Sequence, residues 1–150
     1  MPAALLLAPA PPAHATAPSN PPYWASLRVD EVNMRVGPGE DYRINWVYHR
    51  AHLPVKVLRV MEGWRLIEDP DGARGWVLAK FLTKERGAYV TASPSADIHA
   101  AAAAGSAVLW RAAPGVVGAL GPCREGWCHI DIAGKGGFIR EDQIWGSGAL

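Results

Sequence analysis

Two cysteines and a histidine have a spacing that could support redox, haem or metal chemistry. Cys123 and Cys128 lie in the segment CREGWCH, which ends in His129. A c-type haem attachment site also ends in Cys-His, but it has two residues between its cysteines, and this segment has four. A zinc site built on His129 would need further ligands, and the sequence offers no evident set. We therefore expect no cofactor and no metal site here.

The same cysteines suit a disulfide. The intervening Arg-Glu-Gly of residues 124–126 is a plausible tight turn, so Cys123 and Cys128 would face each other across a hairpin. Disulfides persist in oxidising compartments, where small domains use them to supplement a small core. We expect a disulfide if the chain is exported, and a pair of free buried thiols if it stays in the cytosol.

The remaining candidates for catalysis have simpler interpretations. His49 and His52 are three residues apart in a strand or at its end, so they need not share a face. Asp69 and Asp71 flank a turn proline, where Asp commonly bonds its own backbone. The AGKGG segment of residues 133–137 lacks the first glycine and the Ser or Thr of a phosphate loop, and no Gly-x-Ser-x-Gly elbow occurs. The sequence predicts that the chain is not an enzyme.

Aromatic residues after a glycine-rich corner are the candidates for ligand binding. The segment VGPGEDY, residues 36–42, is followed by loop and strand patterns rather than by the helix that a phosphate cradle needs. We therefore interpret it as a corner. Tyr42, Trp46 and Tyr48 lie at or just after this corner, and aromatic side chains supply large contact area at low entropic cost. The alternative is that Trp46 packs under the loop.

An internal repeat organises the elements that position these residues. The segment EGWRLIEDPDGARGWVLAKFL, residues 62–82, matches EGWCHIDIAGKGGFIREDQIW, residues 125–145. Upstream, two registers compete. One aligns VNMRVGPG with VLWRAAPG, and the other aligns VYHRAHLPV with VLWRAAPGV; we favour the second because it changes the spacing less. It also aligns GPGED with SPSAD and makes the alanine run at 100–104 part of an insertion.

Each copy shows strand signals. PVKVLRV, residues 54–60, alternates apolar and polar side chains, and turn signals such as MEGW and DPDG separate the short runs. No stretch has a sustained helical period with caps. The pattern favours an all-β fold, a small antiparallel barrel or sandwich, with domains at residues 23–86 and 87–147.

These residues resemble a known family, the bacterial SH3-like domains. The resemblance rests on the Arg-x-Gly-Pro-Gly corner at residues 35–39, the Gly-Trp at 63–64 and the Asp-Gly turn before Gly-Trp-Val at 75–77. It implies two small SH3-like antiparallel β-barrels in tandem. It also implies a binding role directed at peptidoglycan stem peptides, or at a peptide or protein of the envelope. The alternative is a structural or interaction protein with no small ligand.

Composition and the first residues bear on location and partners. The chain has 150 residues, of which 49% are hydrophobic and 19% charged, and its 15 basic and 14 acidic residues nearly cancel. No basic run suggests nucleic acid as a partner. Residues 1–22 read as a signal peptide with a short apolar centre and Ala-x-Ala sites, or as a disordered leader, because no Lys or Arg precedes the apolar centre. We expect a periplasmic or secreted protein with no membrane span in the mature chain.

Overall fold

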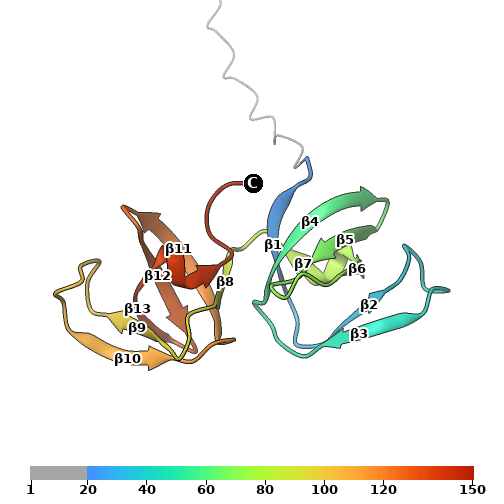
Figure 1. The fold of residues 1–150 in the computed structure, drawn as a ribbon. Coiled ribbons are helices and arrows are strands. Elements are labelled where there is room, and N and C mark those ends of the chain that lie inside the picture. Colours follow the sequence, from blue (N-terminus) through green and yellow to red (C-terminus); the bar gives the residue numbers. More distant parts are fainter. Residues whose placement is uncertain (1–19) are drawn as a thin grey trace, which may run out of the picture.

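A computed structural model describes residues 20–150 and shows two antiparallel sheets, each built from one half of this segment and lying side by side (Figure 1). We call them the N-terminal unit and the C-terminal unit. The predicted fold class, two SH3-like antiparallel barrels in tandem, is confirmed. The leader predicted for residues 1–22 lies almost wholly outside the described residues. The described segment contains no helix long and apolar enough to cross a membrane.

Each sheet has seven strands. The N-terminal unit consists of β1 (Tyr23–Leu27), β2 (Val32–Arg35), β3 (Ile44–Tyr48), β4 (Pro54–Met61), β5 (Trp64–Glu68), β6 (Arg74–Leu78), the short helix η1 (Ala79–Phe81) and β7 (Leu82–Thr83). The C-terminal unit consists of β8 (Gly87–Val90), β9 (Ala96–His99), β10 (Val108–Ala112), β11 (Val117–Arg124), β12 (Trp127–Ile132), β13 (Lys135–Arg140), η2 (Glu141–Gln143) and β14 (Ile144–Trp145). The strand orders are β3-β2-β6-β5-β4-β1-β7 and β10-β9-β13-β12-β11-β8-β14.

Local sequence explains these elements. In β4, Val55 and Val57 are fully buried while Lys56 between them is only partly so, as the alternating pattern predicts. The hairpin between β11 and β12 turns on Glu125 and Gly126, which both have positive φ, the conformation that two-residue hairpins require. Each unit has its own apolar core, and β1 contributes residues to the first core and β8 to the second.

Upstream of residues 62–82 and 125–145, the alignment of the two copies that we favoured from the sequence is wrong. β2 and β3 form a hairpin in the N-terminal sheet, and β9 and β10 form the equivalent hairpin in the C-terminal sheet. β2 therefore corresponds to β9, and β3 corresponds to β10. Residues 36–43 and 100–107 are then equivalent loops of equal length. The alanine run is thus the counterpart of VGPGEDY rather than an insertion, and SPSAD begins before β9 instead of following it. The shared proline of the two corners had suggested an alignment that strand pairing excludes.

Candidate functional site

A hollow of about 380 Å³ lies beside β3. We call it the Trp46 hollow. Three parts of the chain supply its walls: the end of β3 with the residues that follow it, the loop between β5 and β6, and Tyr89 from β8. The lining residues are Trp46, Val47, Tyr48, His49, Arg50, Leu53, Asp69, Pro70, Asp71 and Tyr89. Residues of both units therefore line the hollow.

Trp46 is exposed at the edge of the N-terminal sheet. β3 is an edge strand that pairs only with β2, where Trp46 lies opposite Met34. The Trp46 side chain is 59% exposed, and within residues 20–150 its ring has no aromatic or cation–π partner. It does not pack under the preceding loop, the alternative left open by the sequence. A large aromatic surface left in water is a candidate binding contact.

Tyr48 lies two residues further along β3 and is buried, with only 6% exposed. Its hydroxyl donates a hydrogen bond to Asp69 Oδ2 at 2.9 Å. Burial, reinforced by this bond, raises the pKa of the Tyr48 hydroxyl well above its ordinary range. Tyr48 therefore stays a neutral donor at physiological pH, and it forms the floor of the hollow rather than a freely accessible contact.

Asp69 orders the loop between β5 and β6. Its Oδ1 accepts the backbone N–H groups of Asp71 at 3.0 Å and Ala73 at 2.9 Å, while Oδ2 accepts the Tyr48 hydroxyl. This agrees with the interpretation of the Asp-Pro-Asp segment as a turn that bonds its own backbone. Asp71 is exposed at the hollow, and its carboxylate has no ionic partner in the described part of the chain. The loop thus presents one unpaired negative charge.

The elements that form this hollow differ in the C-terminal unit. The turn between β12 and β13 is only the two residues Ala133 and Gly134, where the N-terminal unit has a five-residue loop. The strand-pairing position of Tyr48 is taken by Ala112 in β10. The counterpart of Trp46 is Trp110, which packs partly buried against the core.

Tyr42 lies apart from the other two predicted aromatics and does not line the Trp46 hollow. Its ring packs over the corner, where a Cβ atom on Gly37 would collide with it and one on Gly39 would lie 3.3 Å from it. Arg35 donates hydrogen bonds to the carbonyl oxygens of Glu40 and Tyr42, which closes the loop. The glycine at position 37 thus makes room for a tyrosine ring, in keeping with a corner.

The histidines are also separated by the structure. His49 lines the Trp46 hollow, whereas His52 has a positive φ in the turn before β4 and lines a different, smaller hollow. Of the ten residues that line the Trp46 hollow, only Trp46 and Tyr48 were predicted from the sequence as binding residues; His49, Arg50 and Tyr89 are among the other eight. His49 and Arg50 directly follow the predicted residue Tyr48 in the sequence and could have been included. Tyr89 could not, because only the packing of the two units brings it there.

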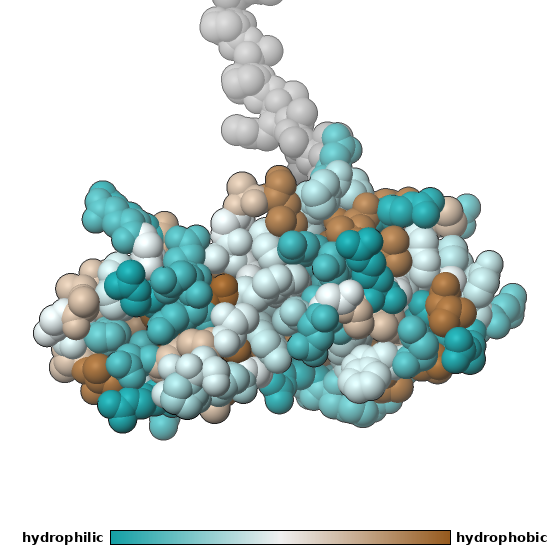
Figure 2. Space-filling view, viewed as in Figure 1, coloured by the Kyte–Doolittle hydropathy of each residue, from teal (hydrophilic) through white to brown (hydrophobic). Residues whose placement is uncertain are grey.

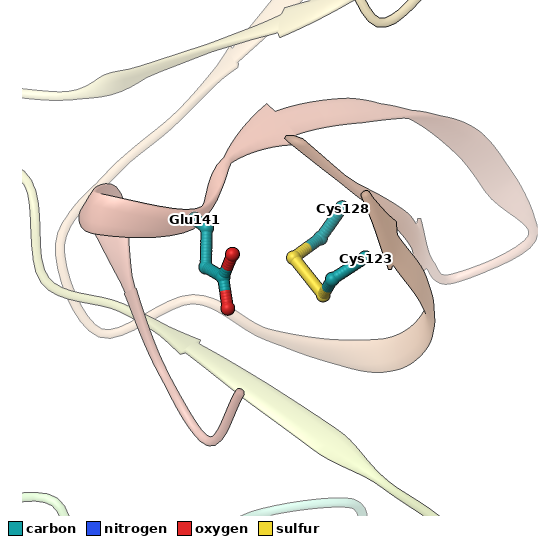
Figure 3. Close-up of side chains that lie close together, drawn as sticks. All are labelled: Cys123, Cys128 and Glu141. Carbon is teal, nitrogen blue, oxygen red and sulfur yellow. A yellow bond between two sulfur atoms is a disulfide. The ribbon is translucent and has the colours of Figure 1, made fainter. Parts of the chain in front are cut away.

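The two cysteines form the predicted disulfide (Figure 3), with an S–S distance of 2.03 Å. They are directly paired across the β11–β12 hairpin. The Glu141 carboxylate points toward the sulfur atoms, and these three residues are the one group of potential metal ligands found within residues 20–150. Because the sulfurs are bonded to each other, they are not available as thiolate ligands.

The surface around these features is mixed. On the face shown in Figure 2, apolar patches are interspersed with hydrophilic ones, and no single broad apolar face dominates. Recognition on this face would therefore depend on individual exposed side chains.

Comparison with known proteins identifies the family. A family model described as the bacterial SH3 domain matches residues 28–83 and 92–146. YrvJ of Bacillus subtilis (strain 168), whose name designates it an N-acetylmuramoyl-L-alanine amidase, is 33% identical over 73 residues, which are 49% of this chain and 14% of that protein.

Solved structures give weaker similarities. NlpC2 from Trichomonas vaginalis is 14% identical with a TM-score of 0.38, over 83% of this chain and 48% of that one. An NlpC/P60 family protein from Bacillus cereus is 12% identical with a TM-score of 0.38, over 85% and 57%. The chain spans about half the length of these structures and a much smaller share of YrvJ. From the two matches to the family model, the chain belongs to the bacterial SH3 domain family, with one copy of the domain in each half.

Proposed function

We propose that this chain is an exported, non-catalytic binding module that recognises a cell-envelope ligand, peptidoglycan or peptide, at the Trp46 hollow. The observation that carries the proposal is the exposed Trp46 ring at a hollow whose floor residue and loop are replaced in the C-terminal unit. A volume of about 380 Å³ lies in the range of small-molecule sites, which run from roughly 300 to 1,000 Å³. The name of the relative YrvJ, N-acetylmuramoyl-L-alanine amidase, refers to a chemical unit of peptidoglycan, which supports peptidoglycan as the ligand.

The chemistry of the hollow supports binding rather than catalysis. Its buried carboxylate, Asp69, has its oxygens occupied by Tyr48 and by two backbone N–H groups, so it is not free to act as a general base. The lining contains no serine or cysteine nucleophile. The residues left to face a ligand are an indole ring and the exposed groups of His49, Arg50 and Asp71, which suit recognition.

The disulfide supports export. Cys123 and Cys128 are joined, and such bonds persist in the periplasm or outside the cell but are rare in the cytosol. A periplasmic or secreted location would place the Trp46 hollow in the compartment where peptidoglycan is found.

A sedimentation assay with purified peptidoglycan tests the proposal. The wild-type chain should cosediment with the polymer, and Trp46→Ala should raise the apparent dissociation constant about tenfold or more, since aromatic anchors that become buried on binding commonly contribute above about 1.4 kcal/mol. Leu109→Ala is the matched control, because Leu109 is an exposed apolar residue of the edge strand β10 in the other unit. Thermal unfolding should show that both variants are folded.

Two results would contradict the proposal. If the wild-type chain stays in the supernatant, peptidoglycan is not its ligand, and the alternative of a structural or interaction protein gains support. If Trp46→Ala and Leu109→Ala both sediment like the wild type, the polymer binds elsewhere on the chain.

A further inference from the structure

A second hollow adjoins the first. It has a volume of about 540 Å³, and its walls come mainly from the loop between β10 and β11 and the start of β11. We call it the Gly115 hollow; its lining residues are Arg50, Ala51, Tyr89, Pro114, Gly115, Val116 and Val117. It shares Arg50 and Tyr89 with the Trp46 hollow. The two hollows are therefore neighbours across the boundary between the units.

The two units meet in close backbone contact at this boundary, which we call the junction. A Cβ atom on Gly87 would collide with the carbonyl oxygen of His52. A Cβ atom on Gly146, whose φ of 123° favours glycine, would lie 3.2 Å from the Pro54 side chain of the N-terminal unit. The two units are therefore in direct contact at His52, Pro54, Gly87 and Gly146.

Side chains at the junction strengthen this packing. The rings of Trp24 and Trp145 meet edge to face with centroids 4.7 Å apart, and Lys56 Nζ lies 5.4 and 5.5 Å from the two centroids. Arg86, in the segment between the units, donates hydrogen bonds to the carbonyl oxygens of Gly146 at 2.7 Å and Gly148 at 2.9 Å. Aromatic and cation–π pairs of this kind stabilise an interface beyond their buried area.

The junction also fixes the walls of the two hollows. Tyr89 and Val117 of the C-terminal unit pack against the core of the N-terminal unit. Arg50 of the N-terminal unit donates a hydrogen bond to the carbonyl oxygen of Gly115 in the C-terminal unit. The residues that separate the hollows are thus anchored from both sides, and a ligand would meet a preformed surface, which lowers the entropic cost of binding.

The charges along this surface select for a particular kind of ligand. Asp71 is exposed on the same hollow as the Trp46 ring, a combination that attracts an amino group through charge and cation–π contact. Arg50 and His49 are exposed at the same hollow, and Arg50 also borders the next one, where a carboxylate would be favoured. The Gly115 hollow adds the apolar side chains of three residues, Pro114, Val116 and Val117.

We infer that the Trp46 and Gly115 hollows form one ligand site, shared by the two units, that takes an extended peptide bearing both amino and carboxylate groups. This inference rests on the proposed function and deepens it, because it assigns the binding of the peptide to residues of both units. A single amino acid would fill only one hollow. A peptide that crosses Arg50 and Tyr89 contacts both units at once, so its affinity depends on residues of the C-terminal unit.

Titration calorimetry with a soluble peptidoglycan stem pentapeptide, on the full chain, tests the inference. Pro114→Tyr places a bulky ring at an exposed position of the Gly115 hollow without touching either core, and should weaken pentapeptide binding about tenfold or more. Tyr89→Ala should do the same, with Tyr89→Phe restoring most of the affinity, since the ring supplies the contact. Trp46→Ala should weaken binding comparably, and Leu109→Ala should leave it unchanged. The dipeptide D-alanyl-D-alanine should bind far more weakly than the pentapeptide.

The outcomes separate this inference from the proposed function. If Trp46→Ala weakens binding while Pro114→Tyr leaves it at the wild-type level, the site lies in the N-terminal unit alone and the shared site is wrong. If the wild-type chain sediments with peptidoglycan but does not bind the pentapeptide, the proposed function stands and the peptide as occupant is wrong. If it binds neither, both are wrong. Pro114→Tyr keeps the test informative should Tyr89→Ala fail to fold.

Discussion

Tyr48 and Asp69 show how one buried pair orders the candidate site. The tyrosine comes from the edge strand β3 and the aspartate from the loop between β5 and β6, and their hydrogen bond joins two walls of the Trp46 hollow. Because Asp69 also accepts two backbone N–H groups, the conformation of the loop depends on this carboxylate. The exposed residues Trp46 and Asp71 are thus positioned by buried neighbours.

We expect Tyr48→Phe to lower the free energy of unfolding by about 1–3 kcal/mol, because it removes a hydrogen bond from a buried carboxylate oxygen. Urea unfolding at neutral pH measures this loss. Tyr42→Phe is the control, since Tyr42 is about half exposed. Equal stabilities for the two variants would show that the Tyr48 hydroxyl does not contribute.

The raised pKa of Tyr48 predicts that the free energy of unfolding depends on pH. The pKa of Tyr48 is raised in the folded state, so above pH 10 the unfolded chain loses this proton while the folded chain keeps it. The free energy of unfolding should be unaffected by Tyr48 below about pH 9 and should fall above pH 10, by up to about 1.4 kcal/mol per pH unit. Urea unfolding between pH 8.5 and 11 should show a shallower fall for Tyr48→Phe than for Tyr42→Phe.

At the scale of elements, equivalent hairpins of the two units differ in backbone conformation. In the turn between β11 and β12, Gly126 has a φ of 82°, whereas Gly63 in the turn between β4 and β5 does not have a positive φ in the range that favours glycine. Neither glycine has neighbours where a Cβ atom would be placed. An alanine would meet no steric collision at either site, so a difference in stability between the two alanine variants would report the backbone strain at Gly126.

We expect Gly126→Ala to cost about 1–2 kcal/mol, the penalty of the left-handed region for a residue with a Cβ atom. Gly63→Ala should change the free energy of unfolding by less than about 0.5 kcal/mol, as is usual for exposed sites. Thermal or urea unfolding of both variants measures the difference. Similar losses at the two glycines would contradict the backbone explanation.

Local patterns were sufficient to predict most strands and turns. The alternation in β4 and the turn residues Glu125 and Gly126 act over a few neighbouring positions, so their outcome is visible in the sequence. The equivalence of the loops at 36–43 and 100–107 is not visible in the sequence, because these loops have the same length but share no sequence pattern. Only the strands on either side, paired in the sheet, establish that they correspond.

The candidate site was predictable only in part, for a similar reason. Trp46 follows a corner motif, and aromatic residues at such places are reasonable candidates for binding. The burial of Tyr48 depends on Asp69, twenty-one residues away, and the approach of Tyr89 depends on contacts between the two units. Such long-range packing leaves no periodic signal in one sequence.

At the scale of the whole molecule, the junction joins the two units through direct contacts. Gly87 contacts the backbone of the N-terminal unit at His52, and Trp24 contacts Trp145. Residues of both units line the two neighbouring hollows. Any change in the relative orientation of the units would therefore alter the surface that a ligand meets.

We expect Gly87→Ala to destabilise the protein by about 1–3 kcal/mol, because the new methyl group has to displace backbone rather than a flexible side chain. Small-angle scattering should also show a larger radius of gyration as the units separate. Gly105→Ala is the matched control, since a Cβ atom there would meet nothing and Gly105 lacks a positive φ. A Gly87→Ala variant as compact and stable as Gly105→Ala would show that the junction tolerates rearrangement.

The contact between Trp24 Nε1 and the carbonyl oxygen of Gly148, 3.1 Å long, brings the two ends of the folded segment together (Figure 1). A pulling force applied through chain attached at both ends would therefore first load this small cluster of contacts, while the sheets on either side would carry little tension. Once these contacts part, the tension would pass into the two sheets, so this cluster marks the place where unfolding under force would begin.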